Sequence, residues 1–183
     1  MIYSITNLFV SKRYVYLRKT IMINTHFNIF SINTSLFLNC LEGVTEEQAI
    51  QHLSPNTNSL KWLAAHVTWA RYQISALMGN PPANNPFDGL FENFRPHAES
   101  DDLKSLVEIK QEWDKATSLL ATSFSTIDAD FWEKDSVISF PLQQDKSNAS
   151  LMAILVQHEC LHIGQMSTLK KHTTGIPMKL TKL

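Results

Sequence analysis

The chain has 183 residues, of which 44% are hydrophobic and 18% are charged, proportions typical of one globular domain with an apolar core. Its formal net charge of -1 gives no electrostatic footprint for nucleic acid or an anionic membrane, so we expect neither partner. A small-molecule substrate or another small, near-neutral partner is compatible with this charge. Its two cysteines, Cys40 and Cys160, are too few for a disulfide framework and are typical of a reducing cytosol.

The start of the chain differs in pattern from the rest. In residues 1–21 positive charges interrupt the apolar runs, whereas a signal peptide places them before one unbroken apolar stretch. No later run approaches the roughly 18 apolar residues that a membrane-spanning helix needs. We therefore expect a cytoplasmic protein with one domain over residues 22–183. Residues 1–21 are an N-terminal extension, either a disordered arm or the product of an incorrectly assigned start before Met22.

Apolar residues recur at intervals of three and four along most of the domain, and this spacing predicts helices. Only five glycines occur, and long stretches lack proline, which argues against a turn-rich β-sandwich. Four long helices together predict an all-α fold, a four-helix bundle. The predicted helices span residues 26–40, 60–78, about 103–125 and 148–174.

Capping residues and loops mark the ends of these helices. Residues 100–102, Ser-Asp-Asp, predict a cap and an acidic first turn for the third helix. Either Ser147 or Asn148 is expected to cap the fourth helix, and Gly175 to end it. Residues 80–98, rich in Pro, Asn and Phe, predict a long loop of the kind that often covers a site.

The fourth predicted helix carries the sequence His-Glu-x-x-His, in which His158 and His162 lie one turn apart on one face. We expect this apolar face to point inward, where two imidazoles without partners would be costly. A divalent transition metal resolves that cost, because neutral imidazole is a good ligand for such ions. Zinc or nickel is the first expectation, and iron or manganese the next. The alternative is a pair of core histidines bonded to backbone or water.

The rest of the chain argues against a zinc peptidase. No Asp or Glu follows Glu159, so the downstream carboxylate ligand of many His-Glu-x-x-His peptidases is missing. Gln165 and Thr168 occupy the positions where the longer metalloprotease pattern requires glycine and histidine. A third ligand must therefore come from upstream.

His66 is the best-placed upstream histidine, because it lies midway along a helix expected to face the fourth one and is flanked by Trp62 and Trp69. Its alternative role is that of a core or boundary residue. His97, in the long loop, is the reserve ligand. The other upstream histidines, which we expect at the surface, are His26 and His52.

Three segments resemble the DinB-like family of metalloenzymes, which are four-helix bundles with a histidine triad. They are Ser-Leu-Lys-Trp-Leu-Ala-Ala-His over residues 59–66, His-Glu-Cys-Leu-His-Ile-Gly-Gln over 158–165, and Gly-Ile-Pro over 175–177. The resemblance extends over most of the chain and implies a homodimer and a metal with an open coordination sphere. The metal ligands that it implies are His66, His158 and His162.

The resemblance implies the metal site more firmly than the reaction, since the family includes thiol-dependent transferases and isomerases and members of no known activity. We expect a metal-dependent hydrolase or a transferase that uses a low-molecular-weight thiol. The alternative is a non-catalytic metal- or small-ligand-binding bundle. Three neighbours of the ligands keep alternative roles. Glu159 is a general base, or else a surface or supporting carboxylate, and Gln165 is the partner of a ligand imidazole or of another helix. Cys160 is expected to be a buried or interface thiol and not a ligand.

Overall fold

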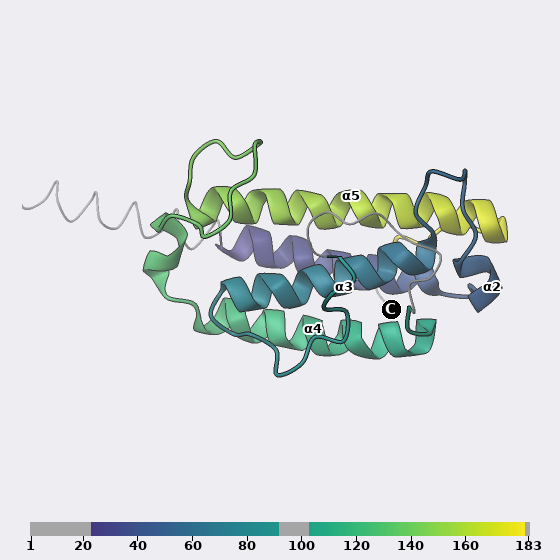
Figure 1. The fold of residues 1–183 in the computed structure, drawn as a ribbon, viewed down its shortest axis with the longest axis horizontal. Coiled ribbons are helices and arrows are strands. Elements are labelled where there is room, and N and C mark those ends of the chain that lie inside the picture. The colour runs from purple at the N-terminus through teal and green to yellow at the C-terminus, as the bar shows by residue number, and fades with distance from the viewer. Residues whose placement is uncertain (1–22, 92–102, 182–183) are drawn as a thin grey trace, which may run out of the picture.

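The computed structural model describes residues 23–91 and 103–181, and four long helices lie side by side in it (Figure 1). Within those ranges the chain forms no strand, and a single isolated β-bridge joins Asp135 to Ser147. The predicted all-α bundle is thus confirmed. The helices are 23–41, α2 (Glu46–Ala49), α3 (Leu60–Leu77), α4 (Leu106–Thr126), the 3-10 helix η2 (Ala129–Glu133) and α5 (Asn148–Thr174).

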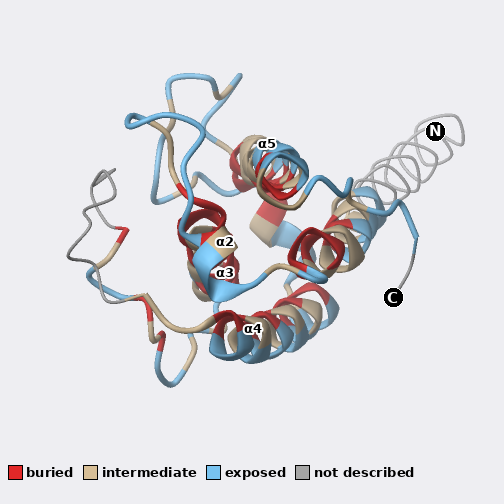
Figure 2. Cartoon of the chain, turned by 90° about the vertical axis from the view of Figure 1, so that its right-hand side faces the viewer, coloured by how far each residue is buried: buried red, intermediate tan, exposed pale blue. Residues whose placement is uncertain are grey.

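The core lies between the four long helices, whose buried residues face the shared interior in the end-on view (Figure 2). Near one end Phe37 of the 23–41 helix stacks on Trp113 of α4, with ring centroids 3.9 Å apart. At the other end Trp132 of η2 packs against Phe124 of α4, with centroids 6.0 Å apart. Large aromatic rings therefore fix the spacing of the helices at both ends of the bundle.

Short-range caps set the ends of α3 and α5, and at α5 they are the predicted residues Ser147 and Gly175. The side chain of Ser59 accepts a hydrogen bond from the Trp62 amide, and the side chain of Ser147 accepts one from the Ser150 amide. Gly175 ends α5 in the left-handed conformation, at φ 73°, which a residue without a Cβ adopts at little cost.

The start of α4 differs from the prediction. Ser105, not residues 100–102, caps this helix, and it forms a reciprocal capping box with Glu108. Leu103 therefore precedes the helix, while residues 100–102 lie outside the described part of the chain. The better signal for the start of the helix was Ser105 followed three residues later by Glu108, because this capping box satisfies two backbone N–H groups at the helix start.

The helix α5 does not bury the face that we expected. His158 and His162 lie half-buried at the edge of the α3–α5 contact, and the fully buried face passes through Glu159 and Lys170, which are 2% and 3% exposed. Leu161, in contrast, is 56% exposed. The apolar residues of α5 lie around much of its circumference, so the pattern alone defined its inward face poorly.

Two further expectations concern the chain as a whole. No helix of the described ranges combines enough length and apolarity to cross a lipid bilayer. The proposed N-terminal extension, residues 1–21, lies outside the described residues, as does the reserve ligand His97.

Candidate metal centre

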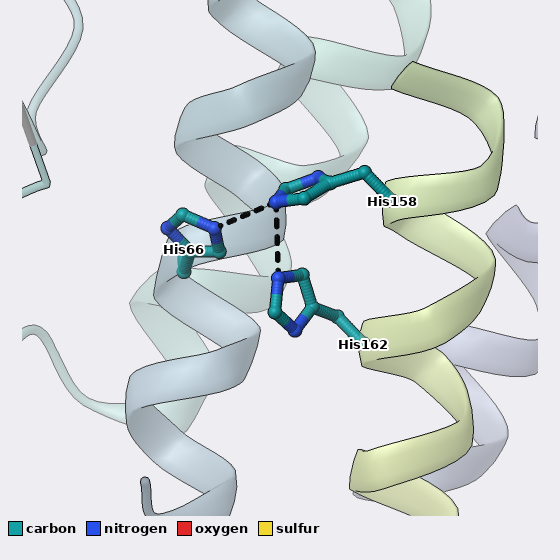
Figure 3. Close-up of side chains that lie close together, drawn as sticks. All are labelled: His66, His158 and His162. Atoms are coloured by element: carbon teal, nitrogen blue, oxygen red, sulfur yellow. Dashed lines mark hydrogen bonds between the residues drawn. The ribbon is translucent and has the colours of Figure 1, made fainter. Parts of the chain in front are cut away.

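Three imidazoles from two helices meet at the α3–α5 contact (Figure 3). His66 projects from α3, and His158 and His162 project from successive turns of α5. The Nε2 atom of His158 lies 3.1 Å from Nε2 of His66 and 3.0 Å from Nε2 of His162. The structure therefore brings together the three histidines that the sequence singled out.

These distances match what one metal ion requires. Imidazole nitrogens bind such an ion at about 2.0–2.1 Å. When the nitrogen–metal–nitrogen angle lies between its octahedral and tetrahedral values, two of these nitrogens are about 2.8–3.4 Å apart. The two observed Nε2 separations at His158, 3.0 and 3.1 Å, lie inside that range.

Hydrogen bonding among the imidazoles cannot satisfy both short contacts. A neutral imidazole has one protonated nitrogen and one bare nitrogen, so Nε2 of His158 can complete a hydrogen bond with only one of its two neighbours. An ion that accepts a lone pair from each ring removes this conflict. The donor set therefore fits a divalent transition metal.

Burial keeps the three imidazoles in the neutral form that metals require. Burial, together with a smaller effect of repulsion from neighbouring imidazoles, lowers the pKa of His66 to about 3 and that of His158 to about 4. Burial also lowers the pKa of His162, although its hydrogen bond with Gln165 acts in the opposite direction. No proton has to leave these rings near neutral pH before an ion binds.

Gln165 orients one of the rings. Its side-chain oxygen lies 2.7 Å from Nδ1 of His162. Because an amide oxygen only accepts, Nδ1 of His162 carries the proton and Nε2, which faces the other histidines, is bare. Of the two roles considered for Gln165, the structure supports that of partner to a candidate ligand.

Aromatic side chains hold the ring of His66. Trp62 stacks on it at a centroid distance of 4.9 Å, and Trp69 lies 5.7 Å away at a similar tilt. Phe91, at the end of the described part of the long loop, meets the ring edge-on at 5.2 Å. The loop therefore reaches the site, as predicted, and His66 has an apolar wall on the α3 side.

Glu159 follows His158 in the chain but points elsewhere. It is buried, and its two carboxylate oxygens each accept a hydrogen bond of 2.8 Å from Arg71 of α3. This pairing does not support the role of general base, because both oxygens are already engaged in the core. Sequence reasoning missed Arg71, although a charged residue within the apolar repeat of α3 was a usable signal.

The remaining candidates lie apart from the triad. His52 is exposed, as expected, but His26 is half-buried and lies 6.2 Å from the ring of Trp132, so its surface assignment was wrong. The long-range contact with η2, more than a hundred residues away in sequence, explains this error. Cys160 is half-buried and accepts a hydrogen bond of 3.3 Å from the Asn33 side chain.

Comparison with known proteins adds one match. A family model described as the DinB superfamily matches residues 29–166, about three quarters of the chain, and this range contains all three histidines of the triad. No curated protein matches the sequence.

Proposed function

We propose that this chain, which belongs to the DinB superfamily, is a metal-dependent enzyme whose divalent ion is held by His66, His158 and His162. The observation that carries the proposal is the convergence of three Nε2 atoms at 3.0 and 3.1 Å around His158. Zinc and nickel are the first candidates because they bind imidazole readily, with iron and manganese next.

The described residues around the triad favour a reaction that requires little proton transfer by the protein. The cluster of candidate ligand atoms found in the described ranges consists of three histidines, without a carboxylate or a thiolate. When bound, the ion would act as a Lewis acid toward a substrate oxygen or sulfur. Glu159 is engaged by Arg71, so a nucleophile that loses its proton easily suits this site best. A low-molecular-weight thiol is such a nucleophile, since its pKa of about 8.5 is far below that of water.

We therefore place a thiol-dependent transferase ahead of a hydrolase, with a small molecule as substrate. The apolar wall of Trp62, Trp69 and Phe91 would exclude water on one side of the site. The second candidate function is a non-catalytic metal- or small-ligand-binding bundle. The same cluster supports it, because three histidines can hold an ion whether or not a reaction follows.

A titration with Co²⁺, an open-shell ion that quenches nearby indoles, tests the site. We expect the tryptophan fluorescence to fall and to level off at one equivalent, because Trp62 and Trp69 lie 4.9 and 5.7 Å from His66. The His158→Ala, His162→Ala double variant should show no saturable quenching. The matched control is His172→Ala, which removes an exposed imidazole from the same helix. Equal quenching in all three proteins would contradict the proposal.

Turnover separates the two candidate functions. The loaded protein would be assayed with ester, amide and electrophilic substrates, with and without a low-molecular-weight thiol. Thiol consumption that the double variant lacks supports the transferase. Metal binding without turnover in any of these assays supports the binding protein.

We also propose that the protein is a homodimer in the cytoplasm. Both cysteines are free thiols, in keeping with a reducing compartment. Ile32 and Leu161 are 59% and 56% exposed and provide apolar surface for a second copy. Light scattering of the purified chain should give twice the monomer mass, and a monomer mass at micromolar concentration would contradict the dimer.

A further inference from the structure

The contact between α3 and α5 contains two polar layers. The outer layer is the half-buried triad, in which His66 meets His158. The inner layer is an ion pair between Arg71 and Glu159, whose side chains are 0% and 2% exposed. Glu159 directly follows His158, so one segment of α5 contributes to both layers.

The guanidinium of Arg71 is fully engaged. Its Nε and Nη2 atoms donate to the two oxygens of Glu159, each at 2.8 Å. Nη1 donates to the hydroxyls of Thr34 and Thr117 at 2.9 and 2.6 Å, and Nη2 also donates to the Phe30 carbonyl at 2.8 Å. All five N–H groups of the guanidinium therefore have acceptors. The acceptors lie on the three other long helices, namely the 23–41 helix, α4 and α5.

Apolar packing alone would fix the rotation of α5 weakly. On this helix a leucine, Leu161, is 56% exposed while Glu159 is 2% exposed. Burial of apolar area has no preferred direction, whereas two parallel hydrogen bonds between a guanidinium and a carboxylate do. Turning α5 by one residue position, about 100°, would separate Glu159 from Arg71 and move His158 away from His66.

We propose that Arg71 and Glu159 are positioning residues that set the rotation of α5 against α3 and thereby hold His158 and His162 opposite His66. Stability alone does not account for such a pair, because a buried ion pair is often no more stabilising than apolar residues of the same size. This inference rests on the proposed metal site.

The test separates stability from metal affinity. In the Arg71→Met, Glu159→Leu double variant the pair is replaced by apolar side chains of similar volume. We expect the Tm of the metal-free variant to equal or exceed that of the wild type, while the Kd for Co²⁺ rises about tenfold or more. A folded variant with the wild-type Kd would overturn the positioning role.

A matched control tests for a general effect of destabilisation. Leu120→Ala, in the buried part of α4, opens a cavity in a core cluster separate from the one that contains Trp62, Trp69 and Phe91 around His66. It should lower the Tm without changing the Kd for Co²⁺. If the double variant does not fold, Arg71→Lys serves instead, because it keeps the charge but loses the planar fork. A wild-type Kd in folded Arg71→Lys would overturn the inference. A wild-type chain that binds no Co²⁺ would overturn the proposed function as well.

Discussion

Replacing Glu159 alone with leucine is expected to lower the free energy of unfolding by about 3–5 kcal/mol. The substitution leaves the Arg71 guanidinium, which is 0% exposed, in the core without its counter-charge. A guanidinium keeps its proton at any pH at which proteins fold, so it cannot become neutral to avoid this cost. Two of its five donors would also lose their acceptors. Urea denaturation of the metal-free protein measures the effect.

The control for this experiment is an exposed ion pair in the same protein. Glu42 and Lys179 are 3.1 Å apart, with side chains 43% and 59% exposed. Glu42→Leu is expected to change the free energy of unfolding by no more than about 1 kcal/mol, because water already solvates both charges. If Glu159→Leu has an equally small effect, the pair is solvated and the described core is incorrect. Adding Arg71→Met to Glu159→Leu should recover most of the lost stability.

The histidine triad was accessible from sequence because helical spacing carries the necessary geometry. Two histidines four residues apart lie on one face of a helix whatever the helix packs against. The missing downstream carboxylate directed the search to His66, and α3 indeed brings this residue to 3.1 Å from His158. The caps of α3 and α5 could be recognised from sequence for the same reason, because Ser59, Ser147 and Gly175 make their capping hydrogen bonds with residues a few positions away in the chain.

The orientation of Glu159 was not accessible in the same way. Its partner, Arg71, is 88 positions away in the chain, and no local rule pairs two charges across a bundle. The apolar residues of α5 also lie around much of its circumference, and periodicity therefore did not show that Glu159 points inward and Leu161 outward. Tertiary contacts decided both orientations.

The same limit explains the smaller errors. Trp132 of η2 covers His26, which sequence placed at the surface, and only the folded chain brings the two together. The start of α4 was a different kind of error, because both Ser100 and Ser105 precede apolar repeats. The reciprocal bond between Ser105 and Glu108 decided between them.

The largest expected effect on binding is the loss of the metal when two of its three ligands are removed. A single imidazole left on α3 cannot replace the chelate that His158 and His162 form from one helix. The remaining ring of His66 would also lose the Nε2 atom of His158, now 3.1 Å from its own Nε2, and the ring of His162, whose centroid lies 4.9 Å away. We expect the affinity to fall below what dialysis retains, with little loss of helical content because the triad lies at the half-buried edge of the bundle.

Metal content after dialysis measures this directly. Wild-type protein and the His158→Ala, His162→Ala double variant would be incubated with Zn²⁺ or Ni²⁺, dialysed, and examined by elemental analysis, with His172→Ala as the control for an exposed histidine. We expect one ion per chain in the wild type and the control, and none in the double variant. The same metal content in the double variant as in the wild type would contradict it.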